Sequence, residues 1–377
     1  MTIKTISNIL ALLATSALTA QTTLTGTITH NGLQRDYRLY VPAGYNPAKA
    51  APLVFNLHGF TSNALEQEFY AGMNAVADTA GFLVCYPNGI DNSWNVGWFF
   101  GSTADDVGFL SALIDELSTR YTLDSNRIYA CGMSNGGFMS YRLACELNDR
   151  IAAVASVTGS MVPAYRPQCN PGRPVAVMEI HGTADPVVPY NGLTLISLPI
   201  DTVVRFWVGN NQCALFADTT VVPDVAPNDG CTAIRIDYRN CNDNTEVALY
   251  RIQDGGHTWP GADTTIGVTN QDFDASVEIW RFFSRFRLNM PVGTEQTPGP
   301  TTVQVFPNPV SDRLYVRLPE HTGLARYAVF NSMGALVLEG SWTGDSVTIT
   351  VGDLADGLYW MLVDGEHGRI GKPFVKQ

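Results

Sequence analysis

The chain has 377 residues, which is long for one ordinary domain and suits a large domain with a smaller module. Hydrophobic residues make up 45% of it and charged residues 15%, so a sizeable core is expected and disorder over most of the length is excluded. The 35 acidic residues outnumber the 23 basic ones, for a net charge of −12. This charge argues against nucleic acid and anionic membrane surfaces as partners, because both select for basic patches.

The first twenty residues have the pattern of an export signal. Lys4 is followed by an apolar run over residues 9–17, and Ala20-Gln21 offers a cleavage site. We therefore predict a signal peptide at residues 1–20. No later segment reaches the ~20 apolar residues needed to cross a bilayer, so we expect no transmembrane segment.

Seven cysteines agree with an exported protein, because most thiols pair in an oxidising compartment and an odd number leaves at least one over. They are Cys85, Cys131, Cys145, Cys169, Cys213, Cys231 and Cys241. None of their spacings resembles a zinc site, and we expect no metal. We predict that Cys145 pairs with Cys169 and that Cys213 pairs with Cys241.

Apolar strand patterns alternate with helical patterns through the first three quarters of the chain. The expected strands are 52–57, 127–131, 175–180 and 247–252, and the expected helices are 105–120, 137–147 and 274–287. Runs this apolar are typical of strands buried on both faces. The pattern predicts an α/β fold, with a mostly parallel sheet and helices on both of its faces. Functional residues of such sheets collect at the carboxyl ends of the strands.

Two acidic residues, Asp105 and Asp106, stand together at the start of the first expected helix. A pair of carboxylates raises the question of a metal site. Their position makes N-terminal capping of the helix the better interpretation, because a capping oxygen accepts free N–H groups of the first turn.

The stretch "CGMSNGG" follows the strand at 127–131 and precedes the helix at 137–147. Gly132-Met133-Ser134-Asn135-Gly136 matches the G-x-S-x-G nucleophile elbow, in which a strand turns sharply into a helix. The two glycines let the neighbouring chains pass each other closely. The pattern with its strand–helix context predicts that Ser134 is a nucleophile.

A serine nucleophile needs a base, normally a histidine. His30 precedes the core strands, and His321 and His367 belong to the C-terminal part. Three candidates remain: His58, His181 and His257. His58 and His181 each precede a glycine at a strand end, where a histidine often orders the turn. His257 follows the last strong strand, as the chain order Ser…Asp…His requires, so we predict His257 as the base.

The acid that orients the base should follow a strand between Ser134 and His257. Asp185 in "HGTADPVVP" meets this condition, because it comes shortly after the strand at 175–180. Four other aspartates lack that placement: Asp201, Asp218, Asp224 and Asp237.

Acyl transfer also needs two backbone N–H groups directed at the developing oxyanion. Asn135, directly after the nucleophile, would supply one. The loop "HGFTSNA" after the strand at 52–57 would supply the other, from Phe60 or, as second choice, from Thr61.

Residues 291–302, "PVGTEQTPGPTT", have the composition of a linker. The region after it, 303–377, contains short strands broken by Gly and Asp, which predicts a small all-β sandwich. The domain organisation that we expect is therefore a large domain at 24–290, a linker, and a β-sandwich.

The large domain resembles the α/β-hydrolase superfamily and, within it, the extracellular polyhydroxybutyrate depolymerase and feruloyl esterase group. The matching stretches are "LHGFTSNA", "WNVGW", "DDVGFL", "CGMSNGG", "IHGTADPVVPY" and "GGHTWPG". The resemblance implies a secreted serine esterase that uses no metal or organic cofactor. It carries the family's nucleophile, acid and base over to Ser134, Asp185 and His257, and its oxyanion loop to Gly59-Phe60.

The same resemblance directs attention to aromatic side chains near these motifs. Trp94, Trp98 and Phe99 are expected to line a pocket for an apolar acyl group, with Trp259 beside the base. The alternative is that these rings belong to the core.

The C-terminal module resembles the sorting domain of proteins exported by the type IX secretion system. The matching stretches are "VFPNPVSDRLYV", "YAVFNSMGALVLEG", "LADGLYWMLV" and "GKPFVKQ". This resemblance implies a partner, the secretion machinery, and a secreted or outer-membrane surface-attached protein. A carbohydrate-binding or fibronectin-like sandwich is the alternative.

The function expected from these features is hydrolysis of carboxylic esters through an acyl-enzyme on Ser134. Feruloyl and acetyl esters of plant polysaccharide, and polyhydroxyalkanoates, are the candidate substrates. A non-catalytic surface binding protein with a hydrolase fold and a peptidase on the same fold are the alternatives. An intact set of three catalytic residues argues against the binding protein.

Overall fold

The computed structural model describes residues 22–288, 303–319, 323–331, 335–365 and 368–377. The predicted signal peptide and linker lie outside the described residues.

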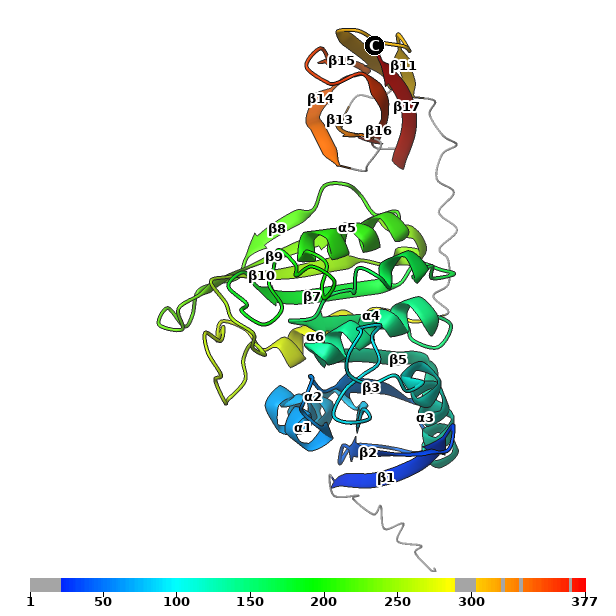
Figure 1. Ribbon diagram of the computed structural model, residues 1–377, viewed down its shortest axis with the longest axis vertical. Coiled ribbons are helices and arrows are strands. Elements are labelled where there is room, and N and C mark those ends of the chain that lie inside the picture. The colour runs from blue at the N-terminus through cyan, green and yellow to red at the C-terminus, as the bar shows by residue number, and fades with distance from the viewer. Residues whose placement is uncertain (1–21, 289–302, 320–322, 332–334, 366–367) are drawn as a thin grey trace, which may run out of the picture.

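One ten-stranded sheet forms the centre of the large domain (Figure 1). Its strands, in spatial order, are β1 (Thr22–His30), β2 (Leu33–Val41), β4 (Leu83–Pro87), β3 (Ala51–Leu57), β5 (Leu123–Met133), β6 (Ala153–Val157), β7 (Ala176–Gly182), β10 (Val247–Gln253), β9 (Thr232–Tyr238) and β8 (Asp218–Val221). The strands from β4 to β10 pair in parallel. The pairs β1–β2 and β9–β8 extend the two edges in antiparallel fashion. The carboxyl ends of the central strands therefore meet at one edge.

Helices cover both faces of this sheet, because successive side chains of a buried strand point to opposite faces. Leu53 and Phe55 of β3 share a core with one set of helices, and Val54 between them shares a core with the other set. The first set is α3 (Asp106–Arg120), α4 (Asn135–Glu146) and α5 (Ile200–Asn210). The second is α1 (Ala64–Ala71), α2 (Met73–Ala80) and α6 (Ala275–Phe283). Two short 3-10 turns are η1 (Arg166–Gln168) and η2 (Asn242–Asn244).

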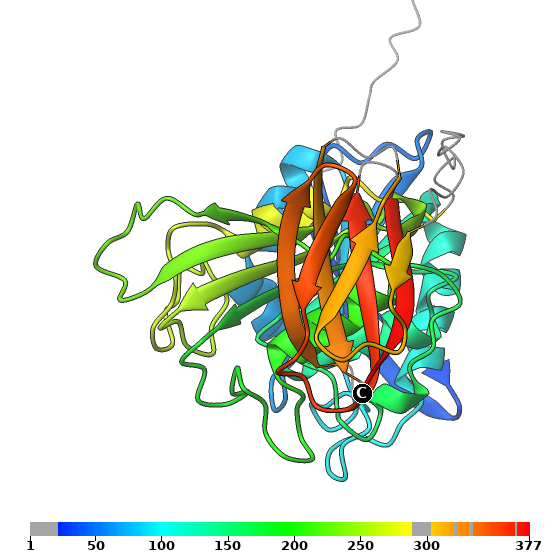
Figure 2. The same cartoon turned by 90° about the horizontal axis from the view of Figure 1, so that it is seen from above.

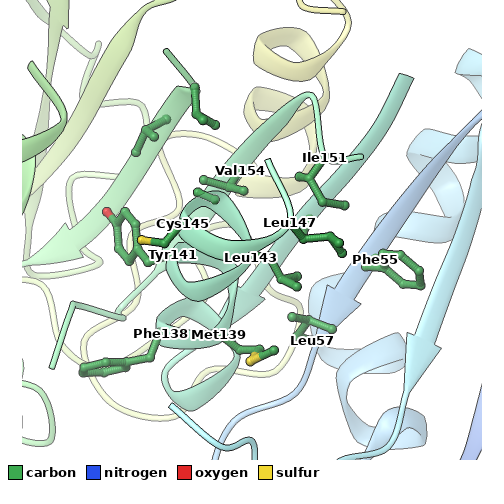
Figure 3. Close-up of a cluster of buried hydrophobic side chains, with 14 of the residues drawn as sticks. Phe55, Leu57, Phe138, Met139, Tyr141, Leu143, Cys145, Leu147, Ile151 and Val154 are labelled. Carbon is green, nitrogen blue, oxygen red and sulfur yellow. The ribbon is translucent and has the colours of Figure 1, made fainter. Parts of the chain in front are cut away.

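Helix α4 is anchored to the sheet by large apolar side chains (Figure 3). Met139 lies beside Leu57, and Leu147, just beyond the helix, lies toward Phe55. These side chains are nearly or fully buried, and full burial of each contributes about 1.5–3 kcal/mol. The packing fixes the start of α4, and therefore the residue just before it, against the end of β3.

The C-terminal module consists of two antiparallel sheets, whose strands are seen from above in Figure 2. One contains β11 (Gln304–Phe306), β12 (Arg313–Arg317) and β15 (Ser346–Thr350), and the other β14 (Leu336–Thr343), β13 (Leu324–Asn331), β16 (Gly357–Gly365) and β17 (Gly368–Lys376). In β12, buried Leu314 and Val316 alternate with exposed neighbours, and both join one core with Val329, Met361 and Phe374. The prediction of an α/β domain with a C-terminal all-β module is confirmed.

Within the described parts of the chain, no helix is long and apolar enough to cross a membrane.

Candidate active site

Ser134 sits at a sharp turn between β5 and α4. Strand β5 ends at Met133 and the helix begins at Asn135, so the serine alone makes the connection. Its φ of 53° and ψ of −119° are rare for a residue with a side chain. A Cβ atom at Gly136 would fall on the carbonyl of Leu57, and one at Gly132 would lie 2.6 Å from the same oxygen. Both glycines are therefore required by the close passage of β3, as the sequence pattern predicts.

His257 and Asp185 come from the loops after β10 and β7. Nδ1 of His257 lies 2.7 Å from Oδ2 of Asp185. The other carboxylate oxygen of Asp185 accepts the N–H groups of Val187 and Val188 at 2.8 and 2.9 Å. With Nδ1 donating to the carboxylate, Nε2 is the nitrogen of His257 left to accept a proton.

The pKa of Asp185 is held well below its usual range. Burial alone would raise this pKa, but hydrogen bonds and positive charge from His181 and His257 outweigh burial. The carboxyl group is therefore a carboxylate over the whole neutral range, as an acceptor for the imidazole N–H must be.

Ser134 and His257 line one cavity of about 530 Å³, together with Gly59 and Phe60. Its other walls are formed by Thr61, Ser62, Glu66, Gln67, Tyr70, Met133, Val187 and Ile266. The structure thus brings together the serine, the histidine–aspartate pair and the loop after β3, which the sequence analysis selected from separate motifs.

The loop after β3 passes directly over Ser134. A Cβ atom on Gly59 would lie 3.5 Å from the Cβ of Ser134. The N–H of Thr61 is already used, because it donates to the carbonyl of Asn92 at 2.9 Å. This favours Phe60 over Thr61 as an oxyanion donor. Asn135 is the first residue of α4, where backbone N–H groups have no partner within the helix.

The expectation that Trp94 and Trp259 line the pocket is corrected by the structure. Both indoles are 1% exposed and neither reaches the cavity. Nε1 of Trp94 donates to the carbonyl of His58 at 3.0 Å, and Nε1 of Trp259 donates to Ser276 Oγ at 3.2 Å. Each indole fills the interior because its one polar atom finds a partner there.

Trp98 is half-buried and belongs to an aromatic cluster beside the cavity. Its ring is stacked with Phe100 at 5.0 Å and lies edge-on to Phe60 at 6.4 Å and to Phe138 at 4.9 Å. Phe60 is 44% exposed and lines the cavity, so the cluster is continuous with it. Phe99 is largely exposed and contacts Phe100 edge-on.

Three apolar side chains near Ser134 could not be identified from the sequence pattern. Val187 and Ile266 line the cavity and are more than half exposed, and Phe100 packs against both Phe60 and Trp98. The available signal was an apolar residue in a polar loop next to a candidate catalytic residue, as in "ADPVVP". Such a signal does not say which way the side chain points.

His58 and His181 are fully buried and each has both ring nitrogens engaged. Nε2 of His58 accepts the N–H of Gly89 at 3.0 Å, and its Nδ1 donates to the carbonyl of Gly59 at 2.8 Å. Burial lowers the pKa of His58 to about 4, so this ring is neutral. His181 lies between Glu179 and Asp185. Neither ring is free to serve as the base.

Asp105 and Asp106 have different partners. Asp105 caps α3 as expected, because its Oδ1 accepts the N–H of Gly108 at 2.9 Å. Asp106 is buried, pairs with Arg35 at 2.6 Å and accepts the N–H of Asn95 at 2.7 Å. Through its hydrogen bond with Asn95, Asp106 therefore holds the loop that leads to Trp98 in place. Among the described residues, no cluster of His, Cys, Asp and Glu has the arrangement of a metal site.

The predicted disulfide bridges, Cys145–Cys169 and Cys213–Cys241, are both present. The remaining cysteines, Cys85, Cys131 and Cys231, are buried thiols. Burial raises the pKa of all three, to about 11 for Cys231, which keeps them protonated and unreactive.

Comparison with known proteins finds esterases and a sorting domain. Residues 35–192 match the family model described as esterase PHB (polyhydroxybutyrate) depolymerase, and residues 304–377 match that of a secretion system C-terminal sorting domain. Feruloyl esterase C of Emericella nidulans is 32% identical over 272 residues, which cover 70% of this chain and 88% of that protein. Feruloyl esterase B of Piromyces equi is 31% identical over 57% of this chain and 41% of its own length.

A bifunctional acetylxylan esterase/xylanase of Neocallimastix patriciarum is 26% identical over 74% of this chain, which spans only 37% of that longer protein. The match to feruloyl esterase C, over 88% of that protein, shows that the chain belongs to the polyhydroxybutyrate depolymerase and feruloyl esterase group and is a carboxylic ester hydrolase. The C-terminal match shows that it carries a sorting domain for secretion or surface attachment.

Proposed function

We propose that the protein hydrolyses esters through an acyl-enzyme on Ser134, with His257 as general base and Asp185 as the acid that orients it. The observation that supports this most is the 2.7 Å contact between His257 and Asp185 beside a cavity that Ser134 also lines.

In this mechanism His257 Nε2 takes the proton of Ser134 Oγ as the oxygen attacks the ester carbonyl carbon. The N–H groups of Phe60 and Asn135 stabilise the resulting oxyanion, and loss of one such donor lowers the rate on the order of 10²–10³-fold. The tetrahedral intermediate collapses, the C–O bond breaks, and His257 gives its proton to the departing alcohol. Water activated by His257 then releases the acid and restores Ser134.

We further propose that the preferred acyl group is aromatic, as in feruloyl esters on plant polysaccharide. The support is the cluster of Phe60, Trp98 and Phe100, which offers exposed ring surface continuous with the cavity. Stacking an aromatic acyl group on such rings contributes about 0.5–1.5 kcal/mol beyond burial of area. Acetyl esters and polyhydroxyalkanoates make no use of ring stacking and are the alternatives.

Hydrolysis of methyl ferulate, 4-nitrophenyl acetate and a polyhydroxybutyrate suspension tests both proposals. Wild type should cleave the first with the highest kcat/KM, and Ser134→Ala should lose activity by several orders of magnitude. Ser284→Ala, at the exposed end of α6, is the matched serine control and should retain it. A fluorophosphonate should label wild type covalently, whereas a binding protein would stay unlabelled. A peptidase would cleave peptides better than any of the three esters.

The division of the chain into a signal peptide at 1–20, an esterase domain at 24–290, a linker at 291–302 and a sorting module at 303–377 is also a proposal. It is supported by the separate hydrophobic cores of the two parts. The sorting module would act through the type IX secretion machinery. Deletion of residues 303–377 should leave active esterase in the periplasm of a host with that machinery. Normal secretion of the shortened protein would contradict this role.

A further inference from the structure

A chain of buried polar side chains runs behind the histidine–aspartate pair. Tyr141 on α4 donates its O–H to Glu179 Oε2 at 2.6 Å, and Oε1 of the same carboxylate lies 2.9 Å from His181 Nδ1. His181 Nε2 faces Asp185 Oδ2 at 3.4 Å, which is the oxygen that binds His257. The side chains of Glu179, His181 and Asp185 have no solvent exposure.

The hydrogen-bond partners fix where the protons of His181 are. Nε2 lies 2.8 Å from the carbonyl oxygen of Val188, which accepts and cannot donate, so Nε2 carries a proton. On the other side, Nδ1 faces a carboxylate that already accepts from Tyr141. A neutral ring would set a lone pair against that carboxylate. A proton on Nδ1 removes this conflict and gives an imidazolium.

The charge balance of the cluster leads to the same state. Glu179 and Asp185 are two fully buried carboxyl groups. Burial raises the pKa of Glu179, and the hydrogen bonds and positive charge of His181, with the hydrogen bond from Tyr141, act against that rise. With both groups ionised, burying them without a cation between them would be costly. Burial lowers the pKa of His181, but hydrogen bonds and negative charge from Asp185 and Glu179 outweigh it and raise the pKa to about 9.

Charged and polar groups on the neighbouring elements do not change the charge balance of Glu179, His181 and Asp185. On β10, Arg251 is the register partner of His181, and its guanidinium is bonded to Tyr190 and Asp201. The ring of Tyr190 meets His181 edge-on at 5.9 Å.

We propose that His181 is a positioning residue for catalysis: an imidazolium held between Glu179 and Asp185 that fixes the catalytic carboxylate from behind and keeps the esterase active at acidic pH. The inference rests on the proposed roles of Asp185 and His257. The positive charge of His181 offsets part of the negative charge that Asp185 presents to His257. Esterase activity should therefore extend to lower pH than it would with an uncompensated carboxylate beside the base.

The test compares kcat/KM from pH 4 to pH 10 for wild type, His181→Gln and Glu179→Gln. The amide introduced by His181→Gln would keep a donor near Val188 without the charge, and Glu179→Gln removes the carboxylate that holds the second proton on His181. Both variants should move the acid limb of the profile upward by roughly one pH unit. At pH values below the limb, kcat/KM of each variant should be about tenfold lower than that of wild type. At alkaline pH the ratio of the variant kcat/KM to the wild-type kcat/KM should become constant.

Tyr190→Phe is the matched control, because it alters a polar group next to His181 and leaves the charges on His181, Glu179 and Asp185 in place. Its acid limb should coincide with that of wild type. A loss of activity that is equal at every pH in the His181 and Glu179 variants would overturn the proposal, since a merely structural role predicts that result.

The protonation state can be read without activity, which covers the case in which His181→Gln does not fold. In ¹⁵N-histidine-labelled Ser134→Ala protein at pH 7, both ring nitrogens of His181 should carry protons, and Glu179→Gln should return the ring to a neutral form. A neutral His181 at pH 7 in the parent protein would overturn the proposal. Failure of the wild type to hydrolyse any ester would instead defeat the proposed function, and the nitrogen signal would still decide the state of His181.

Discussion

Asn135 holds the backbone of Trp94 from both sides. Its Oδ1 accepts the Trp94 N–H at 2.6 Å, and its Nδ2 donates to the Trp94 carbonyl at 3.2 Å. Asn135 is fully buried at the first position of α4. One side chain therefore couples the residue after Ser134 to the loop that carries Trp98 and Phe100.

Replacing this side chain should separate the two roles of Asn135. In Asn135→Ala the backbone N–H stays and the hold on the loop is lost. Because two buried hydrogen bonds disappear, unfolding free energy should fall by about 1–3 kcal/mol. The kcat/KM for methyl ferulate should fall more than that for 4-nitrophenyl acetate. Asn148→Ala, just beyond the other end of α4, is the control and should leave the substrate ratio unchanged. An equal fall for both substrates would contradict the role of the loop.

Trp98 gives a direct test of the aromatic acyl preference. Trp98→Ala removes the ring stacked on Phe100 and should lower kcat/KM for methyl ferulate relative to 4-nitrophenyl acetate by about 2–12-fold. Steady-state kinetics on both esters measures the ratio. Trp360→Ala, an exposed tryptophan of the C-terminal module, should not change it. A ratio that stays constant in Trp98→Ala would favour acetyl esters or polyesters as substrates.

The contributions of the two buried histidines to the free energy of unfolding should change with pH in opposite directions. The folded pKa of His58 is about 4, below the ordinary 6.5. As pH falls, His58 is protonated in the unfolded chain before it is protonated in the folded protein. The stability that neutral His58 contributes is therefore lost as pH falls from 6.5 toward 4. For His181, whose carboxylate partners outweigh burial, the folded pKa is about 9. Its contribution is complete below pH 6.5 and is lost as pH rises through 9.

Urea unfolding at pH 5, 7 and 9 checks these signs. The destabilisation caused by His58→Gln should be smaller at pH 5 than at pH 7. The destabilisation caused by His181→Gln should be smaller at pH 9 than at pH 7. Differences that do not vary with pH would mean that the unfolded and folded states titrate these rings alike.

The cysteine assignment predicts two separate results by mass spectrometry. Reduction should add two hydrogens for each of the bridges Cys145–Cys169 and Cys213–Cys241. Alkylation without reduction should label the native protein slowly and, after unfolding, should label the three thiols Cys85, Cys131 and Cys231. Loss of either bridge should cost about 2–4 kcal/mol of stability. Rapid labelling of native protein would contradict the burial of the thiols.

Local patterns were sufficient to select the residues that meet at the candidate site. The apolar strand before Ser134 and the glycines on either side of it have a steric cause that lies within a few residues. Asp185 could be preferred to Asp201 or Asp237 because its distance from a strand end is itself a local feature. The carboxyl ends of parallel strands then bring such residues together.

Features that depend on distant partners could not be predicted. Trp94 and Trp259 are interior because His58 and Ser276, far away in the sequence, accept from their indoles. For His181, the position before a glycine at a strand end indicates a turn histidine. The available signal was Glu179, a charged residue in an apolar strand, which stands two positions earlier and therefore on the same face.

The backbone of Ser134 is bonded on both sides. Its N–H donates to the carbonyl of Val157 at 2.8 Å, and its own carbonyl accepts the N–H of Phe138 at 3.0 Å. The unfavourable φ of Ser134 is thus imposed by the neighbouring strand and the following helix, with no contribution needed from a substrate. The strain is overcome once, during folding, and in the proposed mechanism every catalytic cycle begins with Ser134 already preorganised for attack.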